Sequence, residues 1–172
     1  MKKILLFISI LVLIPSDMLF GDVPADWVVN ENDYQLNSGV TAIVKLSNGT
    51  DYIVQGNTGD LLAAFGPSYT CTGTGTDEVC AQDGGTEIRG LAEHAGRIAF
   101  GPYEDSTHFL IQIYANQGES GISFKYYHAS LNNIYDLDET IDIDPPNASG
   151  STIAPVLLTG DEIADEQALS FD

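Results

Sequence analysis

A row of carboxylates in the last third of the chain has residue types and spacing suited to binding a metal ion. Residues 136–144 read Asp-Leu-Asp-Glu-Thr-Ile-Asp-Ile-Asp. Alternate side chains of a β-strand share a face, with neighbours on that face about 6.5 to 7 Å apart. In a strand, the four members of this row would be Asp136, Asp138, Asp142 and Asp144. Carboxylate oxygens are the hard ligands that Ca²⁺ prefers, so the row predicts a Ca²⁺ site, with a solvated acidic face as the alternative.

This strand alone would not complete a calcium site. It lacks the glycine and the terminal glutamate of an EF-hand loop, and Ca²⁺ takes about six to eight oxygen ligands. A second segment would have to contribute Asp60, Asp83 or Asp105, with Glu139 joining if a bulge turns it outward.

Tyr69 is the candidate for a different kind of site, one that binds sugars. Exposed aromatic rings beside polar groups can serve as carbohydrate platforms, and Tyr69 lies in a Gly- and Thr-rich segment. Trp27 is expected in the core instead, and Tyr126 and Tyr135 share faces with apolar residues.

The sequence contains no arrangement typical of catalysis. His94, His108 and His128 stand apart from any nucleophile motif, and there is no G-x-S-x-G, H-E-x-x-H or phosphate-binding loop. On a strand, the adjacent Glu104 and Asp105 would face opposite ways and could not act as an acid/base pair. We therefore expect a protein that is not an enzyme.

The start of the chain predicts secretion. Two lysines precede an apolar run over residues 4–14 and then a proline, which is the layout of a signal peptide and too short for a comfortable membrane span. In an exported protein, the two cysteines of the chain, Cys71 and Cys80, are expected to form a disulfide.

Acidic residues dominate the chain that would remain after cleavage. Beyond Gly21, four basic residues face 24 acidic ones. This balance excludes nucleic acid as a partner, because its phosphates are anionic. It fits either a protein kept soluble in a salty medium or one that binds divalent cations.

Short alternating segments separated by turn residues predict an all-β fold. Asn48-Gly49 is a hairpin signal between the first two segments. Without convincing helical periodicity, the pattern favours a two-sheet antiparallel β-sandwich, Ig-like or jelly-roll-like. The expected strands are Val40–Leu46, Tyr52–Gln55, Leu61–Phe65, Glu87–Glu93, Arg97–Tyr103, Phe109–Ala115, Ile122–Tyr127, Ile134–Ile143 and Ile153–Leu158.

The expected organisation is a signal peptide over residues 1–21, a β-sandwich domain over 22–160 and an acidic C-terminal tail over 161–172. Within the domain, residues 67–86 are predicted to form a long loop stapled by the disulfide. On the chain-entropy model, that crosslink contributes about 2.5 to 3 kcal/mol.

Several phrases in the chain together resemble a module found, often in tandem, in secreted or surface proteins of Bacteroidota and related marine bacteria. The resemblance spans residues 26–158 and implies an extracellular β-sandwich without known catalytic residues. In that family the Arg-Gly phrase closely follows the Ala-Ala-Phe strand, whereas here a segment with two cysteines intervenes. The phrases are Asp-Trp-Val-Val-Asn, Asp-Leu-Leu-Ala-Ala-Phe, Arg-Gly-Leu-Ala, Ile-Tyr-Ala-Asn-Gln, Phe-Lys-Tyr-Tyr and Ile-Tyr-Asp-Leu-Asp-Glu-Thr-Ile.

These features predict a non-catalytic structural or adhesive module of the cell surface or extracellular matrix, stabilised by Ca²⁺. It would assemble with itself or with other surface proteins, because edge strands or an extended terminus such as residues 22–36 or the tail can add to a neighbour's sheet. The alternative is a carbohydrate-binding module that recognises extracellular polysaccharide through Tyr69. Neither alternative involves a membrane span.

Overall fold

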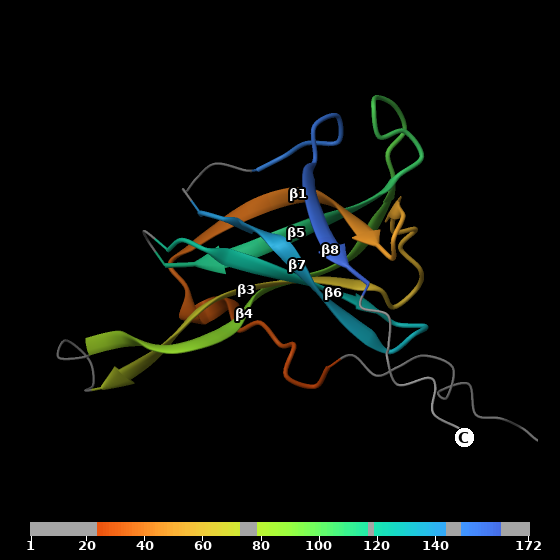
Figure 1. Cartoon of the computed structure of the whole chain (residues 1–172). Helices are drawn as coiled ribbons and strands as arrows, with labels where there is room; N and C mark the ends of the chain where they lie inside the picture. Colours follow the sequence, from red (N-terminus) through yellow and green to blue (C-terminus); the bar gives the residue numbers. More distant parts are fainter. Residues whose placement is uncertain (1–23, 73–78, 117–118, 144–148, 163–172) are drawn as a thin grey trace, which may run out of the picture.

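The computed structural model describes residues 24–72, 79–116, 119–143 and 149–162 (Figure 1). The predicted signal peptide, Asp144 and the predicted tail beyond Glu162 lie outside the described residues.

Eight β-strands account for most of the described chain, and the predicted all-β fold is confirmed. The strands pair in the order β2-β1-β5-β4-β3-β6-β7, and β8 also pairs with β1. The β1–β8 pair is parallel and the others are antiparallel. The strands are β1 (Leu36–Ser47), β2 (Asp51–Ile53), β3 (Leu61–Thr72), β4 (Val79–Arg97), β5 (Thr107–Ala115), β6 (Ile122–His128), β7 (Asn133–Ile141) and β8 (Val156–Asp161), and a short 3₁₀ helix η2 (Glu31–Asp33) precedes them.

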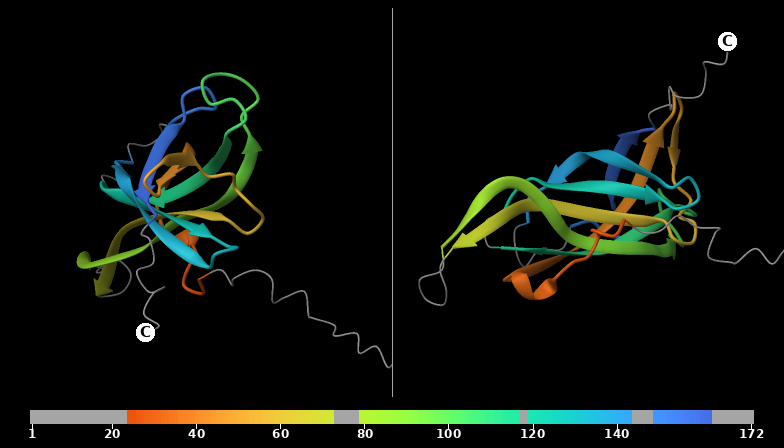
Figure 2. Two further views of the ribbon diagram at one scale, coloured as in Figure 1. Left: turned by 45° about the vertical axis from the view of Figure 1, so that its right-hand side comes forward. Right: turned by 90° about the horizontal axis from the view of Figure 1, so that it is seen from below.

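The sheet curls around an apolar core (Figure 2). Because side chains alternate between faces, every second residue of β1 and β5 points inward: Val40, Ala42, Val44 and Leu46 from β1, and Phe109, Ile111, Ile113 and Ala115 from β5. Residues of β3, β6, β7 and β8 complete the same core. The predicted hairpin between β1 and β2 is present, and Gly49 supplies the positive φ of its turn (93°).

A side chain bridges β7 and β8, which no strand pairing joins among the described residues. The register of β7 against β6 shifts between Leu137 and Thr140, which places Glu139 in a bulge. Its carboxylate accepts a hydrogen bond from the Thr159 backbone N–H (2.5 Å) and another from the Thr159 hydroxyl (2.7 Å). The bulge thus turns Glu139 toward β8.

Strand β4 makes the curl continuous. Its 19 residues pair with β3 as far as Glu93 and then with β5 from His94. Within the part that pairs with β3, Gly90 passes so close to β5 that a Cβ atom there would overlap the backbone oxygen of Gln112. Since both halves of the sheet share this strand, the predicted division into two packed sheets is not confirmed.

Residues 24–35, which we call the strap, run beside the outer face of β3, β4 and β6 (Figure 1). Trp27 is 5% exposed and packs edge-on against Phe65 and Tyr127, with ring centroids 5.6 and 6.2 Å away. Trp27 is therefore a core residue, as predicted, and Tyr127 is equally buried.

Where the structure describes residues 67–86, the prediction of a loop is wrong, because residues 67–72 and 79–86 are in strands. Residues 66–72 of β3 and 79–87 of β4 form a two-stranded arm that projects from the curled sheet (Figure 2). Tyr69 pairs with Gln82 and Thr70 with Ala81 across the arm. The threonines that indicated a loop are β-branched and favour extended backbone, so the composition also suits a strand.

The strand predicted at Arg97–Tyr103 is also wrong. Arg97 ends β4, and residues 98–106 turn back, with Ile98 N–H donating to Ser106 O (2.9 Å). Gly101 has a φ of 101°, and the following residue, Pro102, lacks a backbone donor for a strand ladder. These residues therefore reverse the chain.

Candidate functional site

The base of the arm contains Arg89, which has the largest fully buried side chain among the described residues. Phe65 pairs with Ile88 and Ala64 with Gly90, so Arg89 is the extra residue of a β-bulge. The bulge re-aims its side chain toward Glu119 in the loop between β5 and β6.

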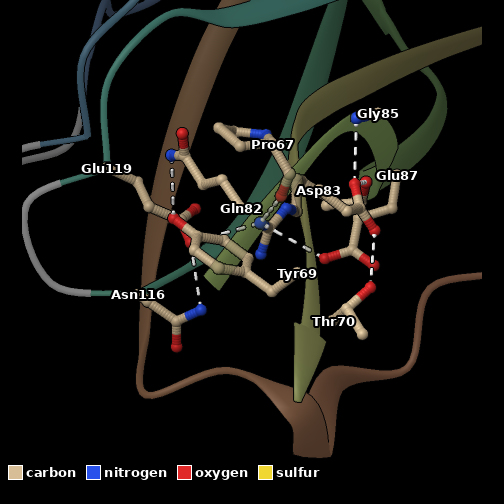
Figure 3. A network of polar contacts seen from close by, with 11 residues as sticks. Pro67, Tyr69, Thr70, Gln82, Asp83, Gly85, Glu87, Asn116 and Glu119 are labelled. Atoms are coloured by element: carbon tan, nitrogen blue, oxygen red, sulfur yellow. Dashed lines mark hydrogen bonds and ion pairs between the residues drawn. The ribbon is translucent and has the colours of Figure 1, made fainter. Parts of the chain in front are cut away.

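Three acceptors surround one nitrogen of this guanidinium (Figure 3). Arg89 Nη2 donates to Pro67 O, at the start of the arm, and to Glu119 Oε1 (3.2 Å). Glu87 Oε1 lies 3.3 Å from the same nitrogen. Glu119 Oε1 also accepts a hydrogen bond from the Asn116 amide (3.0 Å). Arg89 therefore links the arm to the β5–β6 loop.

Two tyrosine rings cover Arg89. Its Cζ lies 4.3 Å from the ring centre of Tyr34 and 5.9 Å from that of Tyr69, both within the range of cation–π attraction. Burial raises the pKa of Tyr34, the charge of Arg89 partly opposes this rise, and Glu87 adds to it. Tyr69 is half-buried and its hydroxyl accepts a hydrogen bond from Gln82 Nε2 (3.3 Å). Tyr69, the predicted sugar platform, therefore packs over the Arg89 side chain. Sugar binding by Tyr69 stays a prediction.

The pairing around Arg89 is incomplete. Arg89 Nε and Nη1, together with Glu119 Oε2, are buried without a hydrogen-bond partner among the described residues. Buried polar groups left in this way reduce stability. The main effect of the cluster is therefore to hold the arm, the β5–β6 loop and Tyr34 in fixed positions. Its contribution to stability is smaller.

Asp83 organises one face of the arm itself. Its carboxylate accepts hydrogen bonds from Ser68 Oγ, from Thr70 Oγ1 (3.1 Å) and from the Gly85 backbone N–H (2.9 Å). The Ser68 bond first, and then the Gly85 bond, lower the pKa of Asp83. One ionised side chain therefore crosslinks the two strands.

Backbone register also favours the predicted disulfide. Cys71 and Cys80 are directly opposite one another on β3 and β4. Opposed residues of antiparallel strands have Cα atoms about 4.5 to 5.5 Å apart, which is within the range that a disulfide spans. The disulfide stays a prediction, and this register supports it.

Two of the predicted calcium ligands, Asp136 and Asp138, lie on the exposed face of β7, and Asp142, just after the strand, is also exposed. Each has its own neighbour. Asp136 pairs with Lys125 (2.5 Å), Asp138 lies 3.4 Å from the Thr159 hydroxyl, and Asp142 accepts from Gly121 N–H (3.0 Å).

The part of the chain that the structure describes contains no group of three or more His, Cys, Asp or Glu side chains arranged to hold a metal. Asp144, the fourth member of the row, lies outside that part. Glu139 uses both carboxylate oxygens on Thr159. Calcium binding by this row therefore stays a prediction.

Asp60, which could have completed a calcium site, is fully buried. Its carboxylate accepts hydrogen bonds from the backbone N–H groups of Asn57 (2.7 Å) and Ala129 (2.9 Å) and from the Tyr126 hydroxyl (2.7 Å). Burial and the bond to Asp60 raise the pKa of Tyr126, which keeps it a donor. Asp60 is thus a structural residue that joins two turns to the core.

His128 lies beside Asp60 and Ser130, yet the three residues do not have the geometry of a catalytic triad. The Asp60 carboxylate is 3.6 Å and the Ser130 hydroxyl 3.2 Å from the same ring nitrogen, Nδ1. In a triad, the serine and the aspartate contact opposite nitrogens of the imidazole. This imidazole therefore cannot relay a proton between them as it stands.

A shallow, open depression of about 630 Å³ lies between β2 and the loop after β4. Its charged groups largely contact one another: Lys45 pairs with Asp51, and Arg97 donates to Asp105 O (2.8 Å) and to Gln55 Oε1 (3.1 Å). These internal contacts assign it no particular ligand.

Sequence reasoning missed Arg89, Glu119 and the role of Asp83. A signal for the first existed, because Ile88-Arg89-Gly90-Leu91 puts an arginine and a glycine inside an apolar strand, and glycine there often marks a bulge. The partner Glu119 is 30 residues away and carries no comparable signal.

No family model, curated protein or solved structure matches this chain. Among the described residues, no helix is long and apolar enough to cross a membrane. The class that the fold defines is therefore an acidic all-β protein with a curled sheet and a projecting arm, and its function has to be argued from these features.

Proposed function

We propose that this protein is a non-catalytic extracellular structural module that assembles with copies of itself through the arm. The observation that carries the proposal is that, among the described residues, no further strand pairs with the outer edges of the arm. Strand β6 pairs with β3 only as far as Phe65, and β5 pairs with β4 only from His94. Between these limits the arm presents two backbone edges.

Unpaired edges are templates for strand addition by another chain. The arm is stiffened for this role at three levels: by its own ladder, by Asp83 across its face, and by Arg89 at its base. The predicted disulfide would add a fourth. A rigid edge loses less conformational entropy on pairing than a flexible loop, which supports assembly over a passive surface loop.

The setting proposed for this assembly is the cell surface or matrix outside the cell. The predicted signal peptide and disulfide support it, as does the resemblance to secreted modules. Ca²⁺ bound at Asp136, Asp138, Asp142 and Asp144 would reduce the negative charge that opposes contact between copies.

Lysines placed on the arm test the proposal, because charged side chains on edge strands oppose further pairing. Ala81 and Thr86 are exposed arm residues. We expect the double variant Ala81→Lys, Thr86→Lys to sediment as a monomer at concentrations where more than half of the mature wild-type protein is assembled. Analytical ultracentrifugation in physiological salt measures this.

The matched control adds the same charge to a strand outside the arm. Leu110 and Gln112 on β5 are exposed residues of a segment paired with β1, so Leu110→Lys with Gln112→Lys should assemble like the wild type. A monomeric wild-type protein, or equal assembly of both variants, would show that the arm is not the interface.

A further inference from the structure

The strap is attached to the rest of the molecule mainly through side chains. Its backbone hydrogen bonds, as far as the described residues show, are internal: Trp27 N–H to Pro24 O (2.9 Å), Val28 N–H to Asp26 O (2.9 Å) and Asp33 N–H to Asn30 O (3.2 Å). Strand pairing begins only at Leu36. No ladder therefore holds the strap in place, in contrast to every β-strand of the sheet.

Two aromatic side chains anchor it. Trp27 fills an apolar recess formed by Leu61, Ala63, Phe65, Ile88, Tyr127 and Ala129. Tyr34 lies over Arg89 at 4.3 Å. Between the anchors most of the segment is exposed, since Val28 is 73% accessible and η2 has no buried residue, while Val29 is half-buried against the recess. The strap thus binds its recess as a short peptide would, mainly through inserted side chains.

We infer that the Trp27 recess also binds the strap of a second copy, and that strap exchange links neighbouring subunits. Trp27 and Tyr34 would make the same contacts whether the strap lies in the recess of its own chain or in that of a second copy. Exchange therefore changes only the path of the chain between the strap and β1. Exchange of an identical element is a low-cost route to association. Gln35, exposed between Tyr34 and Leu36, is the position at which the chain would change direction.

This inference rests on the proposed self-assembly but uses a different surface from the arm. Reciprocal strap exchange between two copies would close a dimer, whereas one-way donation from copy to copy would produce a ring or an open filament. Combined with edge pairing by the arm, either form would give each subunit two independent links.

A labelled peptide of residues 22–35 tests whether the recess accepts a strap supplied in trans. The receptor is the full mature chain carrying Ala81→Lys and Thr86→Lys, which separates this result from that of the arm. We expect saturable binding in fluorescence anisotropy, at least about 100-fold weaker binding of the Trp27→Ala peptide, and unchanged binding of the Val28→Ala peptide. Absence of saturable binding, or equal binding of the Trp27→Ala peptide, would overturn exchange.

Isotope mixing then tests exchange between whole chains. Lys125 lies beside the recess, with its Nζ 5.8 Å from the Phe65 ring centre, and the strap carries Asp26 and Glu31. In a refolded mixture of ¹⁵N and unlabelled mature protein, carbodiimide should join strap carboxylates of one isotope to Lys125 of the other. Strap crosslinks confined to single-isotope pairs would contradict the inference.

Discussion

The charged side chain of Arg89 has no solvent contact. The side chain of Glu119, its nearest ion-pair partner, is almost as buried. A buried ion pair yields little net stability, because the loss of hydration offsets the attraction. What the pair does provide is position. Pro67 O fixes the arm, Glu119 fixes the β5–β6 loop, and Tyr34 fixes the end of the strap, all at one guanidinium.

The Asp row is the residue-scale feature that most directly invites measurement. If Ca²⁺ binds the folded protein alone, a hundredfold excess over the dissociation constant adds about 2.7 kcal/mol of stability. For a chain of this size that raises the unfolding midpoint by roughly 5 to 10 °C. We expect this rise between EDTA and millimolar Ca²⁺ for the mature wild type, measured by calorimetry, and its loss in Asp138→Asn with Asp142→Asn.

A control pair removes the same number of charges elsewhere. Asp26→Asn with Glu31→Gln changes two strap carboxylates and should retain the calcium effect. Comparison with NaCl at equal ionic strength separates binding from general screening. An identical midpoint in EDTA and in Ca²⁺ would mean that the row is a solvated strand face.

The faces of Asp136 and Asp138 could be predicted from the sequence, but their partners could not. Alternation is a local rule, so Asp136 and Asp138 outward, with Leu137 inward, followed directly from spacing. The contact between Glu139 and Thr159 depends on a bulge and on the position of β8, which are set by the whole sheet. For the same reason, nothing local indicated that Arg89 meets Glu119.

The arm is an element without a core of its own, so its polar crosslinks should govern its order. The hydrogen bonds from Ser68 and Gly85 lower the pKa of Asp83 below its ordinary value of about 3.9. A lowered folded-state pKa stabilises the folded arm above the unfolded-state pKa, and this contribution is lost as pH falls through the folded-state value. We therefore expect the Thr70 and Gly85 amide resonances to move together below about pH 4 in NMR spectra.

Asp83→Asn keeps an acceptor but removes the charge, so it should abolish the shared acid transition of these two amides. Asp161→Asn, at an exposed position of β8, should leave the transition unchanged. If Thr70 and Gly85 respond at different pH values, or still respond in Asp83→Asn, another group orders the arm.

Elements were predictable where each strand has one buried and one exposed face. That pattern identified most of β1, β5, β6 and β7, whose inward residues alternate. The arm has no buried face over most of its length, so its strands show no alternation of apolar and polar residues. Only its composition could be used for prediction, and a segment rich in Thr and Gly is compatible with a loop or with a two-stranded ribbon. Of the 19 residues of β4, the alternation identified Glu87–Glu93, whereas residues 79–86 were predicted as loop and Arg97 was assigned to a separate strand.

At the scale of the whole molecule, net charge opposes the proposed assembly. Twenty-four acids against four bases after Gly21 make every copy repel every other. The arm edges and the strap recess offer short-range attraction, so association would depend on how far the repulsion reaches. That reach is the Debye length, about 30 Å at 0.01 M salt and about 8 Å at 0.15 M.

Assembly should therefore increase with salt. In sedimentation runs on mature protein at fixed concentration, we expect monomer at 0.01 M NaCl and a growing assembled fraction toward 0.15 M. Attraction between opposite charges would give the reverse trend, since salt would weaken it. The arm variant Ala81→Lys, Thr86→Lys is the control. Its four added positive charges per pair of copies reduce the repulsion between copies. If this variant is still a monomer at 0.15 M NaCl, assembly of the wild type depends on pairing of the arm edges and not on net charge alone. If this variant assembles more readily than the wild type, repulsion alone controls association, and the arm contributes no specific contact.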